Sequence, residues 1–295
     1  MKQEKARATR TRFSPVMIVM CVILCLYVLS LLIPFIWAFF TSFKSDIEFE
    51  ENALGLPQKW VWNYGWMFTE FKKVVFTETE IKSIGLWAMF GNSLLYSVGS
   101  AFAAAIVPCI TAYLCARFKY KFSSFVYGIV IVTMVLPIVG NQPSQVDVAD
   151  KLHVLDTVYG LWLFNASFLG LYFLVFYNVF KALPRDFTEA AKIDGCSWYG
   201  VFFRIIVPMI VPSLVTVAVL TFMSSWEDFM GALLYLNKPE TYTVAYALKM
   251  FNDSSMSDYG ATFAMSAASL VPILVLFFFF QKNLVEGISI QGLKG

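Results

Sequence analysis

Charged side chains are scarce in this chain. Asp, Glu, Lys and Arg make up 14% of its 295 residues, whereas a soluble globular domain carries about 25%. Apolar residues reach 59%, and the mean hydropathy is +0.68. A water-soluble protein of this size could not bury so much apolar side chain, because its surface still grows with its mass. The shortage of charge excludes a soluble enzyme, a disordered regulator and a nucleic-acid binder, and it predicts a protein solvated by lipid.

Residues that build catalytic and metal sites are also few. His153 is the only histidine, so neither a histidine metal site nor a Ser-His-Asp triad is expected. The sequence contains no Gly-x4-Gly-Lys-Ser/Thr loop to cradle nucleotide phosphates. Its five cysteines lie in or beside apolar runs or in a basic loop, and they predict no disulfide framework. We therefore expect no catalytic residue, no metal and no cofactor bound by this chain.

Long apolar runs, in contrast, are abundant. A bilayer-spanning helix needs about 20 mostly apolar residues. Six segments satisfy this requirement and predict an all-α, polytopic membrane protein with about six transmembrane helices: roughly 16–41, 86–116, 122–140, 157–180, 206–230 and 261–282. The first run is longer than the core of a signal peptide, which spans about 7–15 residues, and is interpreted as a retained helix.

The few charges are distributed unevenly between the loops. With the N-terminus inside, the inner segments hold 14 basic and 5 acidic residues, and the outer segments hold 8 and 15. Because Lys and Arg gather on the cytoplasmic side, both termini are predicted to be cytosolic. We expect a basic tail over residues 1–15, one transmembrane domain over 16–285 and a C-terminal tail over 286–295.

The segment 43–85 is predicted to lie outside. It is acidic near Asp46 and Glu48, and it is rich in aromatic residues from Trp60 onward. Aromatic residues of this kind also form belts at the membrane interface. We favour a short folded cap over such a belt.

The loop between the fourth and fifth segments has a distinct local pattern. Pro184 suits the first turn of a helix, and Glu189 places negative charge near the positive end of that helix. Gly195 falls where a left-handed C-terminal cap belongs, and Ser197 can begin a second helix. Residues 184–204 therefore predict a helix–glycine–helix elbow at the cytosolic face, named the elbow below.

The elbow resembles a known family signature, EAA-x3-G-x9-I-x-[LV]-P. This signature marks the membrane subunits of bacterial ATP-binding-cassette (ABC) importers that work with a solute-binding protein, within the MetI-like superfamily. Asp194 is typical of the sugar-transporting branch, whereas Val207 stands where leucine is most usual. The matching positions are Glu189, Ala190, Ala191, Gly195, Ile205 and Pro208.

The resemblance covers most of the chain. The end, 286–295, is similar to the tail of oligosaccharide permeases of the maltose-permease G-subunit type. Trp226 resembles the start of a Trp-Asn-x-Phe element, with Glu227 in place of the usual Asn. These similarities imply the type I ABC importer permease fold and a place in the bacterial cytoplasmic membrane.

The resemblance also implies partners: a second homologous permease subunit, a dimeric ATP-binding subunit that holds Mg-ATP, and an extracytoplasmic solute-binding protein. The elbow is then a coupling helix. Glu189 would orient it on the ATPase, and Ala190 and Ala191 would permit close backbone approach. Asp194, Gly195, Ile205 and Pro208 belong to the same coupling motif. The aromatic residues Phe187, Trp198 and Phe202 are expected to supply most of the docking energy. An ordinary amphipathic interfacial helix is the alternative.

Polar residues within the spans are uncharged for the most part, which favours a neutral sugar as cargo over an ion. We expect Asn92, Trp226 and Tyr235 to line the substrate pathway. A permease of the same class for another solute remains an alternative. A secondary transporter driven by an ion gradient is disfavoured, because the first four spans hold no central Asp or Glu.

Overall fold

The computed structural model describes residues 15–58, 60, 86–118, 120–136, 140–253 and 259–292. Within these ranges every regular element is a helix. Three parts of the predicted organisation lie outside the described residues: 1–14 of the basic tail, 61–85 of the external segment and 293–295 of the C-terminal tail. The chain divides into two compact units, unit 1 (1–64 and 258–267) and unit 2 (65–257 and 268–295).

Four helices among the described residues are long and apolar enough to cross a membrane: Pro15–Thr41, Trp87–Arg117, Trp198–Trp226 and Tyr259–Leu284. They agree with the first, second, fifth and sixth predicted segments. The third segment contains α5 (Lys121–Val135), which is apolar but only 15 residues long. At a rise of 1.5 Å per residue, α5 extends about 22 Å, less than the bilayer core of about 30 Å.

The fourth predicted segment is not one continuous helix, so this part of the prediction was wrong. It forms α7 (Val158–Asn165) and α8 (Leu171–Ala182), with a break between them. In the break the hydroxyl of Ser167 accepts a hydrogen bond from the Leu169 amide at 3.1 Å. Gly170 has a φ of +129°, a backbone conformation that other residues rarely adopt. Apolar composition alone hides this break, because most of the interrupting residues are themselves apolar.

Unit 1 contains α1 (Pro15–Thr41), α2 (Asp46–Glu51) and the first residues of α14 (Tyr259–Gly292). Phe49 on α2 stacks on Tyr259 with ring centroids 4.6 Å apart. The Asp46 carboxylate accepts a hydrogen bond from the Tyr259 amide at 2.7 Å. The Lys44 ammonium donates to the carbonyl of Asn52 at 2.7 Å. The first part of the external segment is therefore folded against α14 within this unit.

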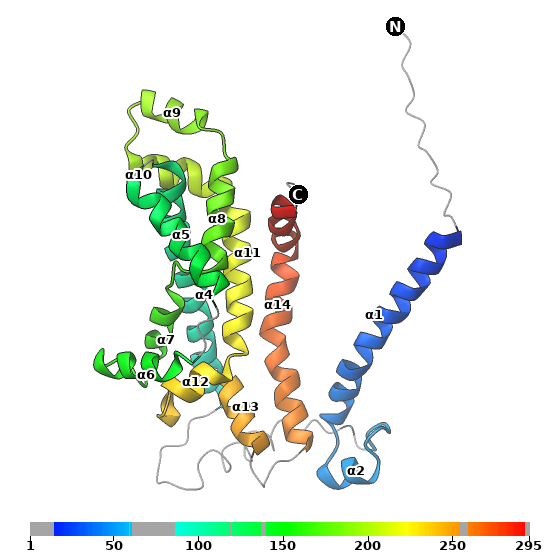
Figure 1. Cartoon of the computed structure of the whole chain (residues 1–295). Helices are drawn as coiled ribbons and strands as arrows, with labels where there is room; N and C mark the ends of the chain where they lie inside the picture. Colours follow the sequence, from blue (N-terminus) through cyan, green and yellow to red (C-terminus); the bar gives the residue numbers. More distant parts are fainter. Residues whose placement is uncertain are drawn as a thin grey trace, which may run out of the picture. The chain divides into compact units, whose positions relative to one another are not determined.

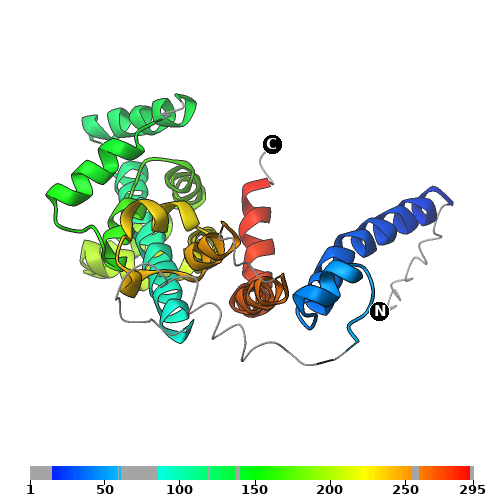
Figure 2. The same ribbon diagram turned by 90° about the horizontal axis from the view of Figure 1, so that it is seen from below.

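Unit 2 is built around α4 (Leu86–Arg117), which packs against α7, α8 and α11 (Val207–Trp226). In the view of Figure 2, α4 (cyan) lies beside green and yellow helices of this unit. Every third or fourth residue of α8 is buried in the core of the unit, namely Phe173, Phe176 and Phe180. This spacing places the three rings on one side of the helix.

Short helices lie at both ends of unit 2. Figure 1 shows α9 (Asp186–Ile193) and α10 (Trp198–Val201) at one end. Helices α6 (Gln142–Lys151) and α12 (Phe229–Tyr235) lie at the opposite end (Figure 1). The remaining elements are the π-helical turn η1 (Phe202–Ile206), the 3₁₀ turn η2 (Pro239–Thr241) and α13 (Val244–Asp253).

Candidate functional site

The first arm of the elbow is α9. Asp186 and Glu189 lie in its first turn, where carboxylates stabilise the positive end of a helix. Glu189 and Ala190 are exposed, and Phe187 keeps 47% of its surface. Ala191 is only 7% exposed and packs into the core of unit 2. Of the two motif alanines, only Ala190 therefore faces outward. Ala191 instead packs α9 against the core of unit 2.

The turn of the elbow is a Schellman motif centred on Gly195, as the sequence predicts. Gly195 has a φ of +79°. The Gly195 amide donates to the Lys192 carbonyl at 3.1 Å, and the Cys196 amide donates to the Ala191 carbonyl at 2.9 Å. These two bonds satisfy carbonyls that the end of a helix otherwise leaves unpaired. Asp194 and Gly195 are both exposed, so the turn presents its polar backbone outward.

The second arm begins at Ser197, also as predicted. Its hydroxyl accepts a hydrogen bond from the Gly200 amide at 3.1 Å, which caps α10. The π-helical turn η1 follows, and the Val207 amide donates to the carbonyl of Phe202, five residues earlier. Pro208 has no amide hydrogen, and its ring would clash with a carbonyl four residues before it in a regular helix. The wider turn relieves this clash, and Pro208 lies exposed beyond it, with Ile205 half-buried.

Aromatic side chains pack the elbow against the rest of unit 2. The Trp198 ring meets the Phe118 ring edge to face, with centroids 5.0 Å apart. The Tyr113 ring on α4 lies 4.7 Å from the Phe202 ring. Phe202 is 9% exposed, so the expectation that it docks a partner was wrong in this structure. Two apolar side chains that sequence reasoning missed are far more exposed, Ile193 at 86% and Tyr199 at 79%.

The three predicted pathway residues lie in three different places of unit 2. Asn92, near the start of α4, donates its side-chain amide to the carbonyls of Glu240 at 2.8 Å and Tyr242 at 3.1 Å. Its neighbour Ser93 accepts from the Val244 amide at 2.8 Å. Asn92 therefore ties α4 to the segment around η2, and a pathway role for it stays a prediction.

Trp226 ends α11 and is 3% exposed. Its indole nitrogen donates to the Ser269 carbonyl at 3.0 Å, and its ring stacks on Phe222 with centroids 5.8 Å apart. The ring also borders a cavity of about 220 Å³ between the end of α11, α13 and α14. Exposed Glu227 and half-buried Phe229 line the same cavity.

Tyr235 lies at the opposite end of unit 2 from the elbow, among α6, α7 and α12. Its ring stacks on Phe164 at 4.8 Å, and its hydroxyl donates to the side-chain oxygen of Gln145 at 3.2 Å. Burial, with a smaller contribution from the negative charge of Asp228, raises the pKa of Tyr235. The hydroxyl is therefore uncharged at neutral pH and can act as a donor.

Asp228 has a structural role that its charge alone did not reveal. One carboxylate oxygen accepts from the Gly231 amide at 2.8 Å and caps α12. The other accepts from the Tyr96 hydroxyl at 2.7 Å. Asp228 thereby links α4, the end of α11 and the start of α12.

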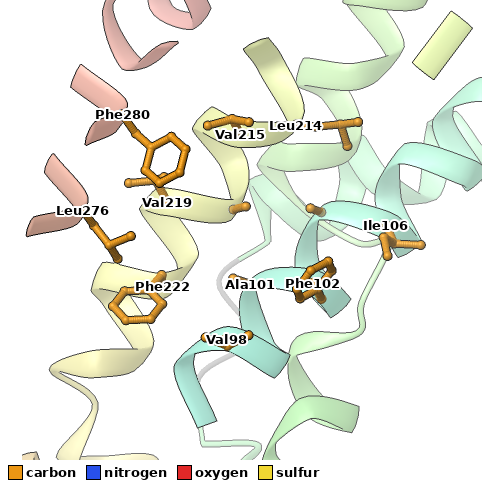
Figure 3. A pocket seen from close by; sticks show the side chains of 12 residues that line it. Val98, Ala101, Phe102, Ile106, Leu214, Val215, Val219, Phe222, Leu276 and Phe280 are labelled. Atoms are coloured by element: carbon orange, nitrogen blue, oxygen red, sulfur yellow. The ribbon is translucent and has the colours of Figure 1, made fainter. Parts of the chain in front are cut away.

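A second cavity in unit 2 is a crevice of about 380 Å³ between α4, α11 and α14. Figure 3 shows apolar side chains from all three helices around it, and every residue that lines it is apolar. Such a crevice offers no hydrogen bond to a sugar.

No three His, Cys, Asp or Glu side chains of the described ranges lie close enough together to hold a metal ion.

Relatives of known class cover nearly the whole chain. It is 28% identical to the probable ABC transporter permease protein YurM of Bacillus subtilis, over 93% of this chain and 87% of that protein. It is 31% identical to the probable starch degradation products transport system permease protein AmyC of Thermoanaerobacterium thermosulfurigenes, over 90% and 94%. The arabinooligosaccharides transport system permease protein AraQ of Halalkalibacterium halodurans is 26% identical, over 89% and 91%.

The fold is also that of a solved transporter chain. A bacterial ABC transporter involved in the import of the acidic polysaccharide alginate matches with a TM-score of 0.74 at 19% identity, over 90% of this chain and 95% of that one. Residues 104–290 match the family described as the inner membrane component of binding-protein-dependent transport systems. Since this match spans more than half of the chain and includes the elbow, the chain belongs to the family of inner membrane components of binding-protein-dependent transport systems.

Proposed function

We propose that this multi-pass membrane protein forms half of the translocation pathway of an ABC importer for a sugar, most readily an oligosaccharide. The relatives AraQ and AmyC are named for arabinooligosaccharides and starch degradation products, which supports this cargo. In the proposed complex a second, homologous permease forms the other half of the pathway. An extracytoplasmic binding protein delivers the sugar, and a separate dimeric subunit binds Mg-ATP and hydrolyses it.

The observation that carries the proposal is the exposed face of the elbow. Phe187, Ile193 and Tyr199 are 47%, 86% and 79% exposed, and Glu189 on the same segment is exposed as well. Their segment lies outside the long core of unit 2, on short helices with polar turns. Large apolar side chains this exposed, on a segment that also carries exposed charges, are typical of a surface that a partner protein covers. The partner that fits this surface is the ATP-binding subunit.

The proposed topology has six crossings and two cytosolic termini. Helix α5 supplies the third crossing, and α7 and α8 together supply the fourth. Basic residues near the elbow, among them Lys181, Arg185 and Arg204, support a cytosolic place for it. In this orientation α6, α12 and α13 face the binding protein.

The sugar pathway is proposed to pass the end of α11, where Trp226 and Glu227 border the cavity of about 220 Å³. The carboxylate of Glu227 can accept hydrogen bonds from sugar hydroxyls. Asn92 and Tyr235 would contribute at the outer end of unit 2, where their polar groups already bind backbone and Gln145.

Reconstitution of the full complex in proteoliposomes tests this function. We expect loaded binding protein to stimulate ATP hydrolysis and sugar uptake only when both permeases and the ATPase are present. Ile193→Asp should release the ATPase during purification, because it places a charge in the docking surface. Leu152→Asp is the matched control: Leu152 is 53% exposed at the other end of unit 2, and its substitution should leave the ATPase bound. Uptake that an ionophore abolishes at unchanged ATP would instead identify an ion-coupled transporter.

A further inference from the structure

A single lysine joins the two arms of the elbow. Lys192 lies in the last turn of α9. Its ammonium group donates to the carbonyl of Cys196 at 3.1 Å and lies 4.3 Å from the centre of the Trp198 ring. Cys196 and Trp198 both follow the Gly195 turn. The Lys192 side chain therefore crosses the turn and contacts the second arm at two points.

Trp198 connects Lys192 to aromatic residues on and beside the long helices of unit 2. Its ring meets Phe118, which follows the end of α4, with centroids 5.0 Å apart. Phe118 in turn meets Tyr113 of α4 at 5.9 Å. The Tyr113 ring packs against Phe180 of α8 at 5.3 Å and against Phe202 at 4.7 Å. A continuous row of ring contacts thus leads from Lys192 to the helices at the centre of unit 2.

Few side-chain contacts besides those of Lys192 hold α9 in its orientation. It has eight residues, and isolated helices shorter than about 12–15 residues are marginal. Ala191 is its only residue in the buried core of the described structure. The turn itself contains a glycine, which adds no side-chain contact. Besides the two backbone hydrogen bonds of the Gly195 turn, the contacts of Lys192 therefore help to set the angle between α9 and α10.

We propose that Lys192 and Trp198 form a brace that fixes α9 against α10 and α4, and so passes movement of the docked ATPase to the membrane helices. The brace rests on the proposed function of the elbow. Both side chains are positioning residues: they hold the surface formed by Phe187, Glu189 and Ile193 at a fixed angle. A flexible elbow would dock equally well but would transmit less of the movement.

The test uses the complete complex in proteoliposomes and measures sugar molecules imported per ATP hydrolysed. Lys192→Met keeps the aliphatic stem and removes the charge and the donor. We expect this ratio to fall about three- to tenfold, in line with the strength of a cation–π contact plus a hydrogen bond, while the ATPase still co-purifies. Lys192→Arg should restore most of the ratio, because a guanidinium group can donate and also lie over the ring.

Lys181→Met is the matched control. Lys181 lies 4.7 Å from the centre of the Tyr177 ring within the single helix α8, so its loss removes the same kind of contact without loosening the elbow. The transport ratio should stay at the wild-type value. Trp198→Leu should lower the ratio at least as much as Lys192→Met, because it also removes the contact with Phe118. The double variant should be little worse than Trp198→Leu alone, because both substitutions remove the contact between Lys192 and Trp198.

Three outcomes would overturn the brace. In the first, Lys192→Met leaves the ratio unchanged. In the second, the losses caused by Lys192→Met and Trp198→Leu add in the double variant. In the third, Lys192→Met releases the ATPase during purification, which would make Lys192 a docking residue. Trp198→Phe, together with thermal unfolding of each variant, separates misfolding from loss of the brace. A wild-type complex that fails to couple ATP hydrolysis to uptake would refute the proposed function itself, whereas a coupled wild type with unaffected variants would refute the brace alone.

Discussion

Gly195 shows how one residue sets the shape of the elbow. Its φ is +79°, and a side chain added there would meet no atom within 4 Å. Any effect of substitution on the isolated chain must therefore come from backbone strain and not from a clash. An L-residue other than Gly or Asn in this region costs about 1–2 kcal/mol.

We expect Gly195→Ala to destabilise the turn by about 1–2 kcal/mol and to lower the stimulation of ATP hydrolysis by loaded binding protein. Gly195→Asn should be milder, because Asn tolerates this backbone region. Stimulated ATP turnover and thermal unfolding of the purified complex measure both effects. Equal behaviour of the alanine variant and the wild type would show that the turn does not need its left-handed residue.

Tyr242, beyond η2, provides a pH-dependent contribution to stability. Burial raises its pKa to about 12, with smaller contributions from Tyr246 and Asp156. An unfolded tyrosine titrates near 10. The folded state then holds the Tyr242 proton more tightly than the unfolded state does. The contribution of Tyr242 to stability is therefore fully present below about pH 10 and is lost as the pH rises from about 10 to 12.

We expect the unfolding temperature in detergent to drop across this pH window, and to drop less in Tyr242→Phe. The wild-type chain in the same detergent is the reference. An identical pH profile for both proteins would mean that Tyr242 is not the group responsible.

For single residues, contacts with sequence neighbours could be predicted, whereas contacts with distant parts of the chain could not. Pro184, Gly195 and Ser197 act on neighbours within a few residues, and the structure places the last two as predicted. The expectation for Pro184 was wrong, because it lies two residues before α9 and not in its first turn. Asn92 instead binds carbonyls 148 and 150 residues away. No pattern near Asn92 specifies such partners.

At the scale of elements, α8 illustrates packing within lipid. Phe173, Phe176 and Phe180 are all 0% exposed and anchor α8 among α4 and α11. Because lipid solvates an exposed phenylalanine well, their contribution comes from close packing more than from escape from water.

We expect Phe176→Ala to lower the free energy of unfolding by roughly 2–4 kcal/mol, the lower part of the range for cavity-forming substitutions. Phe125→Ala is the control, because Phe125 on α5 is 57% exposed and leaves no internal cavity. Denaturation in mixed micelles measures both variants. Equal losses would show that the α8 core is loosely packed.

Element boundaries were predicted where polar or helix-breaking residues mark them. Helix α11 ends at Trp226, directly before Glu227 and Asp228 and four residues before the expected bound near 230. The break before α8 and the turn η1 were not predicted. Both depend on how a nearby Gly or Pro is accommodated by the packed helices, and composition does not report this.

At the scale of the whole molecule, orientation is the principal proposal. Single cysteines in a cysteine-free background test it with a membrane-impermeant thiol reagent. Val148→Cys on α6 should react in intact cells, and Phe187→Cys on α9 only after the membrane is opened. Both positions are exposed, at 48% and 47%, so accessibility within the chain is matched. The reverse pattern would invert the proposed topology.

The amino-acid sequence alone predicted the class of protein, four helices long and apolar enough to cross a membrane, and the glycine turn and serine cap of the elbow. These features follow from apolar runs and from capping residues, which act over one helix or one turn. The folded structure was needed to show that Ala191 and Phe202 face inward and that Lys192 meets Trp198. It was also needed to show that Asn92, Trp226 and Tyr235 lie in separate places. Burial and pairing depend on which distant segments pack together, and that is a property of the folded chain rather than of any local pattern.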